Sequence, residues 1–161
     1  MPSTKQRISA ICLSAAIMMG GAWLASQVPT VNAEAGHSNP NGLTVTVDDV
    51  RNGSGQVVVL IFNDRDAFKA YDYNKVVGYR EVPASTGAIQ AFFPDLKPGF
   101  YAVVAFHDEN ENRDLDMAEQ VPTEGYAVSG ARDAYDEPPF KRAASDKPHR
   151  ALRLFYLKQK S

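Results

Sequence analysis

Short segments with the composition of β-strands recur between turns from residue 43 onward. Residues 43–47, Leu-Thr-Val-Thr-Val, alternate apolar and polar side chains, which predicts a half-buried strand. Residues 56–62 are β-branched and apolar on both faces, which is typical of a strand at the centre of a sheet. Similar patterns predict further strands at 88–93, 100–106, 126–129 and 150–157.

The turns between these segments determine the fold class that we expect. The segments at 43–47 and 56–62 flank Asn-Gly-Ser-Gly, which predicts a hairpin whose second strand is central. Asp64 is a candidate N-cap for a short helix through Tyr71, and residues 139–144 suit one or two helical turns. The chain is therefore expected to be mainly β: an antiparallel β-sandwich of about seven strands, immunoglobulin-like or prealbumin-like, with one or two short helices.

The last predicted strand gives a specific expectation for the core. Leu152 and Leu154 alternate with Ala151 and Arg153. Because alternate side chains of a strand point to opposite faces, both leucines should face inward, and Arg153 should face solvent or a carboxylate.

The N-terminal region has the pattern of an export signal. Lys5 and Arg7 precede a charge-free run that extends to Ala33 and has an apolar centre. A basic start, an apolar middle and a small residue at the exit are typical of a secretory signal peptide, here with cleavage after Ala33. An uncleaved membrane anchor is the alternative. Cleavage would give a signal peptide at 1–33, a flexible lead-in at 34–42 and a single β-sandwich domain at 43–161, secreted or periplasmic, with no membrane span.

Composition excludes several classes of function. The 161 residues carry a formal net charge of −2, which gives no basis for nucleic-acid binding, since that requires a strongly basic surface. Cys12 is the only cysteine and lies in the expected signal peptide. An intrachain disulfide and a zinc–thiolate site are therefore excluded.

An acidic segment directly after the predicted strand at 100–106 has the spacing of a calcium loop. Hard divalent cations prefer six or more oxygen ligands, and a tightly wound loop supplies them from alternate residues. Leu115 falls at the eighth position, which is usually apolar. The predicted calcium ligands, in order along the loop, are Asp108, Asn110, Asn112, Asp114 through its backbone carbonyl, Asp116 and Glu119.

The sixth position of this loop departs from the pattern. Glycine is usual there because the chain turns sharply with a positive φ, but this sequence has Arg113. A non-glycine residue in that conformation costs about 1 kcal/mol, and the positive charge opposes a bound cation. The twelve residues nevertheless hold six acids and one base, a repulsion that a cation would offset. A solvated acidic turn with coincidental spacing is the alternative.

Two further function classes remain open from the sequence. His107 adjoins the acidic loop and, with the loop carboxylates, would suit a hydrolase-type enzyme, although no nucleophile motif accompanies it. Phe68, Tyr71 and Tyr73 would suit a carrier for a small apolar ligand at an open end of the sandwich, provided that a pocket lies between the sheets. The leading interpretation is a binding or structural module that holds a divalent cation and meets an unknown protein or envelope partner.

Four phrases occur in an order that resembles a known family. They are Phe93-Pro-Asp-Leu-Lys-Pro-Gly-Phe-Tyr-Ala-Val103, His107-Asp-Glu-Asn-Glu-Asn-Arg-Asp-Leu-Asp116, Pro122-Thr-Glu-Gly-Tyr126 and Pro138-Pro-Phe140. Together they resemble the bacterial domain of unknown function 2141 family over nearly all of the expected mature chain. The resemblance implies a secreted protein with a signal peptide and one small β-domain, and it implies no enzymatic activity. Members of that family typically carry glycine where this chain has Glu111 and Arg113.

Overall fold

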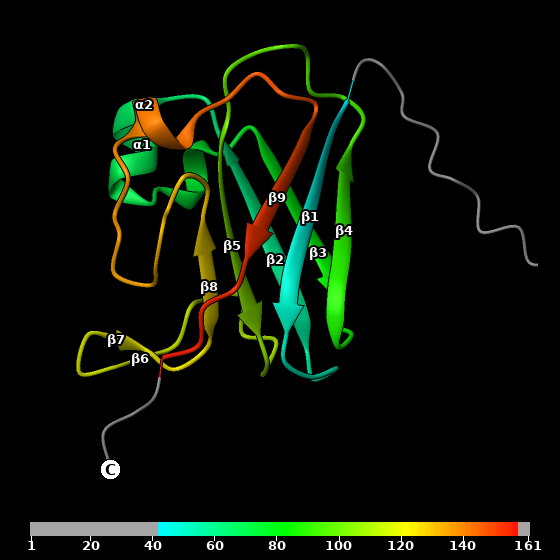
Figure 1. The fold of residues 1–161 in the computed structure, drawn as a ribbon, viewed down its shortest axis with the longest axis vertical. Helices are drawn as coiled ribbons and strands as arrows, with labels where there is room; N and C mark the ends of the chain where they lie inside the picture. The colour runs from blue at the N-terminus through cyan, green and yellow to red at the C-terminus, as the bar shows by residue number, and fades with distance from the viewer. Residues whose placement is uncertain (1–41, 158–161) are drawn as a thin grey trace, which may run out of the picture. The chain divides into compact units, whose positions relative to one another are not determined.

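Two β-sheets face each other in the computed structural model, which describes residues 42–157 (Figure 1). The predicted signal peptide and nearly all of the lead-in lie outside the described residues. The first sheet has the order β4-β1-β9. Its strands are β1 (Leu43–Val50), β4 (Gly87–Phe93) and β9 (His149–Arg153).

The second sheet is antiparallel and has the order β3-β2-β5-β8. Its strands are β2 (Gln56–Phe62), β3 (Gly78–Pro83), β5 (Ala102–Asp108) and β8 (Gly125–Val128). A small hairpin of β6 (Met117–Ala118) and β7 (Val121–Pro122) lies between β5 and β8 in the chain. The expected sandwich of about seven strands is confirmed for the described part of the chain, whose two larger sheets hold three and four strands.

The main core fills the space between the sheets. Val45 and Val47 of β1 are fully buried, whereas Thr44 and Thr46, which alternate with them, are only half-buried, as the alternating pattern predicts. Leu152 and Leu154 are 4% and 3% exposed and pack in the same core, while Arg153 is exposed and pairs with Asp49. The inward placement of both leucines is therefore confirmed.

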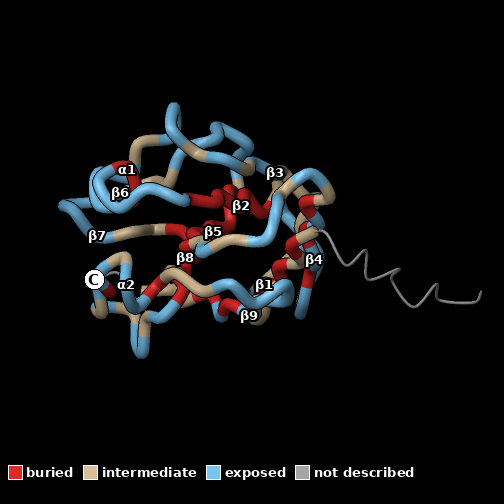
Figure 2. The backbone as a smooth tube through the Cα atoms, turned by 90° about the horizontal axis from the view of Figure 1, so that it is seen from above, coloured by how far each residue is buried: buried red, intermediate tan, exposed pale blue. Residues whose placement is uncertain are grey.

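A second apolar layer covers the outer face of the four-stranded sheet. Strands β2 and β5 are buried on both faces, as Figure 2 shows along their length. Their outer residues, among them Leu60 and Phe106, belong to one apolar cluster with buried residues of α1 (Arg65–Ala70) and α2 (Phe140–Ala143). The Asp64 carboxylate caps α1 by accepting hydrogen bonds from the backbone N–H groups of Asp66 and Ala67, at 3.0 and 2.8 Å. The predicted cap is confirmed, and the short 3-10 helix η1 (Tyr73–Lys75) follows α1.

The predicted hairpin between 43–47 and 56–62 is wrong. Strand β1 pairs with β4 and, in parallel, with β9, whereas β2 pairs with β3 and β5. The connection therefore crosses from one sheet to the other. It does so because β2 is apolar on both faces and needs cover on both, whereas β1 has one buried face. The central position of β2 was predicted correctly.

Strand β3 was not predicted from the sequence. Its burial does not alternate and most of its residues are exposed or half-buried, so it carries no period-two pattern. No helix within residues 42–157 is long and apolar enough to span a membrane.

Candidate functional site

The acidic loop begins at Asp108, the last residue of β5. This side chain is fully buried, and Gln56, the first residue of β2, lies opposite it in the sheet. Its carboxylate accepts hydrogen bonds from the Gln56 side-chain amide at 2.9 Å and from the backbone N–H groups of Asn112 and Arg113 at 3.0 and 2.9 Å. The sheet thus fixes Asp108, and Asp108 in turn winds the next five residues around its carboxylate.

Two non-glycine residues of this turn have left-handed backbone conformations. Glu111 has a φ of 60° and Arg113 a φ of 67°. The positive φ predicted for the sixth loop position is therefore present. The Arg113 side chain extends to β3, where its Nε lies 2.8 Å from Oε1 of Glu81. A hydrogen bond from Tyr79 is the main cause that lowers the pKa of Glu81, and Arg113 adds to it.

Asn110 and Asn112 both bind Asp116 through their side-chain amides. The Asn110 Nδ2 donates to Asp116 Oδ2 at 2.7 Å, and the Asn112 Nδ2 donates to Asp116 Oδ1 at 2.8 Å. Their own oxygens accept backbone N–H groups of Asn112 and Asp114, at 3.1 and 2.8 Å. Four of the predicted ligands, including Asp108, contribute their side chains to one hydrogen-bond network, which Asp114 joins through its backbone N–H. Within residues 42–157, no three His, Cys, Asp or Glu side chains form a group that could hold a metal ion, so the amides are essential to any such site.

The remaining two predicted ligands lie differently. The exposed Asp114 accepts the backbone N–H of Leu115 at 2.9 Å, and the half-buried Leu115 packs against the outer apolar layer. Glu119 lies with Gln120 in the tight turn between β6 and β7, where both have positive φ. Glu119 is exposed, and no hydrogen bond or ion pair within the described chain joins it to the other ligands. In a calcium hand, a helix brings the twelfth residue back to the ion; here a β-hairpin occupies that place.

Glu124, directly before β8, binds the loop, and this role was not predicted from the sequence. It is 4% exposed, and its carboxylate accepts the backbone N–H groups of Glu109 and Asp116, at 2.8 and 3.1 Å. It therefore ties the beginning of the loop to the ninth position. Burial raises the pKa of Glu124, and the charges of Asp116 and Asp108 contribute to the rise. The sequence pointed to Glu124 only through the Glu-Gly-Tyr phrase of the family resemblance.

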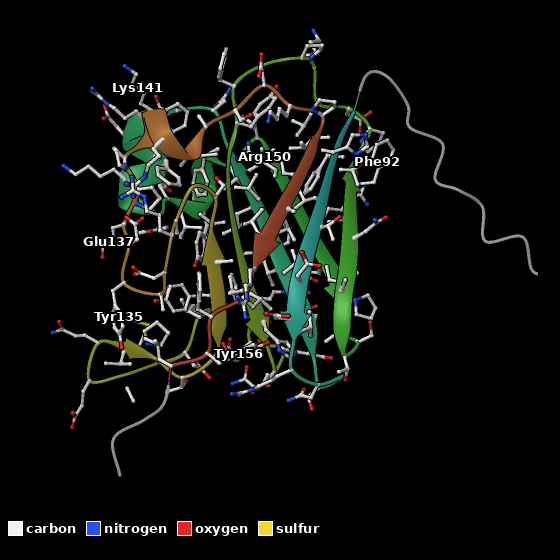
Figure 3. The ribbon with its side chains drawn as sticks, viewed as in Figure 1. Phe92, Tyr135, Glu137, Lys141, Arg150 and Tyr156 are labelled. Carbon is white, nitrogen blue, oxygen red and sulfur yellow. The ribbon has the colours of Figure 1, made fainter. Side chains whose placement is uncertain are left out.

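His107 lies in the interior directly before the loop. The ring is fully buried, with Nε2 2.8 Å from the backbone oxygen of Ser54 and Nδ1 2.8 Å from the Tyr156 hydroxyl. Because a carbonyl only accepts, Nε2 must carry a proton. Figure 3 shows Tyr156 near the ends of β5 and β8 that lead into the loop region. Both ring nitrogens are thus occupied by the protein, which gives no support to a hydrolase that uses His107.

The three aromatic residues considered for a ligand carrier do not line a cavity between the two sheets. Phe68 lies on the buried face of α1, where its ring contacts those of Phe62, Tyr71 and Phe140. Tyr71 and Tyr73 are partly exposed and line a pocket on the outer face of the four-stranded sheet. The pocket is therefore outside the sandwich and not between its sheets.

The chain is similar to one protein family. A family model described as "Uncharacterized protein conserved in bacteria (DUF2141)" matches residues 45–150, more than half of the chain. Neither the curated proteins nor the solved structures gave a match.

Proposed function

This chain belongs to the uncharacterized bacterial family DUF2141, and we propose that its mature domain is an exported binding module whose acidic loop, residues 108–119, holds a calcium-type cation. The family description supplies no activity, so the proposal rests on the loop itself. The N-terminal charge pattern supports export to the periplasm or beyond the cell.

One observation carries the proposal: the first half of the loop is already wound around the Asp108 carboxylate. Asp108 accepts two backbone N–H groups, and Glu111 and Arg113 adopt the left-handed conformations that the turn requires. Each such residue costs about 1 kcal/mol relative to an ordinary conformation. A purely solvated acidic turn has no need for this arrangement, whereas a cation site requires it to direct oxygens from alternate residues inward.

The residues that would hold the cation are those that the loop brings together. They are the carboxylates of Asp108 and Asp116, the amide oxygens of Asn110 and Asn112, and the backbone carbonyl of Asp114. The two amides now present nitrogen to Asp116, so cation binding would require them to turn and present oxygen instead. Glu124 would position the loop through its two backbone hydrogen bonds. Glu119 is left out of this set because it lies in the β6–β7 turn.

Isothermal titration of the mature domain tests the proposal. Calcium should bind with a Kd of about 10⁻⁴–10⁻³ M, the range of extracellular modules, and magnesium more weakly because it requires a smaller octahedral shell. Asp116→Asn removes a carboxylate without emptying the space, and it should weaken binding by about tenfold.

Asp95→Asn is the matched control, since Asp95 is an exposed carboxylate in the β4–β5 connection, outside the loop. Its calcium affinity should equal that of the wild type. Equal affinity in the folded Asp116→Asn variant, or no calcium heat from the wild type, would contradict the proposal.

A further inference from the structure

A pocket of about 540 Å³ lies on the outer face of the four-stranded sheet, beside its edge strand β8. Residues of β5 and β8, including Val104, Phe106 and Val128, form apolar parts of its lining. Tyr71 and Tyr73 line it from the segment that follows α1, and Met117 lines it from the β6–β7 hairpin. The pocket therefore forms where three segments distant in sequence meet over the sheet.

Aromatic side chains in this lining are exposed to an unusual degree. Tyr71 is 44% exposed and Tyr73 37%, and the ring of Tyr73 stacks at 6.5 Å on that of Phe106. Tyr135 is 82% exposed. It lies with Glu137 on the segment between β8 and α2, along the side of the molecule that joins the helices to the β6–β7 hairpin (Figure 3). Large apolar surfaces that remain exposed beside a pocket are typical of a ligand site.

The charges of the pocket all have one sign. Its lining includes Asp114, Asp136 and Glu137 and contains no lysine, arginine or histidine. Asp136 is neutralised by an ion pair with Arg142, but neither Asp114 nor Glu137 has an ion pair within the described residues. Burial is the main cause that raises the pKa values of Tyr71 and Tyr73, and Glu137 and Asp114 respectively add to it. The negative charges of Asp114 and Glu137, neither of which forms an ion pair within the described residues, thus lie close to the tyrosines of the pocket.

We propose that this pocket binds a small organic cation with an apolar body, such as an aromatic or alkyl quaternary ammonium compound. Tyrosine rings attract a cation through their negative faces, and unpaired carboxylates add to that attraction. The apolar body would lie on Val104, Phe106 and Val128. An organic anion of the same size is repelled by Asp114 and Glu137, and a neutral molecule gains nothing from them.

Benzyltrimethylammonium is the probe, with benzyl alcohol and phenylacetate as neutral and anionic controls that share its ring. Titrations of the full mature chain, followed by NMR shifts of the tyrosine rings, are run in the presence of a calcium chelator so that the acidic loop does not contribute. The cation should bind at least about tenfold more tightly than either control. Glu137→Gln, at an exposed position, should weaken cation binding about fivefold and leave benzyl alcohol unchanged. Asp95→Asn should bind as the wild type does.

Three outcomes would overturn this inference. They are equal binding of the three probes, unchanged cation affinity in Glu137→Gln, and absence of binding.

Discussion

Arg113 experiences two opposing effects at a single loop position. Its φ of 67° is unfavourable for a residue with a side chain, yet that side chain reaches Glu81 across the surface. An exposed pair of this kind contributes at most about 1 kcal/mol, which is similar to the cost of the backbone conformation. Arg113→Gly should therefore change the stability of the cation-free domain little.

Glu109 provides a pH-dependent contribution to stability beside the same loop. The Arg51 guanidinium binds its carboxylate, and this contact is the main cause that lowers the pKa of Glu109. A lowered pKa means that the contribution is present above the ordinary glutamate value, 4.5, and is lost as the pH falls through the lower value of the folded state.

Glu109→Gln should therefore lose less stability on acidification than the wild type does. Urea unfolding at pH 7 and at about pH 3 measures the difference. Asp95→Asn, an exposed carboxylate without an ion pair within the described residues, should retain the wild-type dependence. An equal loss in Glu109→Gln and the wild type would show that the ion pair with Arg51 contributes nothing.

Strand β9 closes the three-stranded sheet by pairing with β1 in parallel. Leu154, one residue beyond β9, is 3% exposed and packs in the main core. Leu154→Ala should lower the free energy of unfolding by about 2–5 kcal/mol, as truncation of a buried leucine does. Urea unfolding checks this.

Arg153→Ala is the matched control, because Arg153 is exposed and its pair with Asp49 is at the surface. It should change stability by less than about 0.5 kcal/mol. If Leu154→Ala also changed the free energy of unfolding by less than about 0.5 kcal/mol, the C-terminal segment would be peripheral to the core.

Strands with a strong hydrophobic pattern were predicted from the sequence. Which strand each of them pairs with was not. The alternation in β1 and the apolar run in β2 identify both strands, but local patterns contain no information on which distant strand lies alongside. The connection at 51–55 resembles a hairpin turn and instead crosses between the sheets. Strand β3 lacks a pattern because most of its side chains remain accessible.

For the acidic loop, the sequence likewise indicated the local turn but not the long-range contacts that hold it. Spacing identified the residues that wind around Asp108, because they are neighbours in sequence and each turn is local. It does not account for the position of Glu119, which lies in the turn of a β-hairpin where the pattern assumes a following helix. Glu124 reaches the loop by the pairing of β8 with β5, a long-range contact that no local spacing encodes.

At the scale of the whole molecule, the four-stranded sheet holds the acidic loop in place. Asp108 is fixed by β5 and β2, and Glu124 by β8, so three strands of one sheet position a single loop. A cation that binds such a loop binds the native state and not the unfolded chain, and it must therefore raise the stability of the whole domain. Calcium binding to the loop should therefore be detectable as a rise in the stability of the whole domain.

The thermal unfolding of the mature domain with and without calcium tests that coupling most directly. Calcium at about ten times its Kd, or about 10 mM, should stabilise the native state by about 1.4 kcal/mol. For a domain of this size the Tm should rise by roughly 3–8 °C, chelation should reverse the rise, and magnesium should produce less. Arg113→Gly should show a larger rise, because the positive charge that opposes the cation is removed. An unchanged Tm in both the wild type and Arg113→Gly would contradict the proposal and leave the loop as a solvated acidic turn.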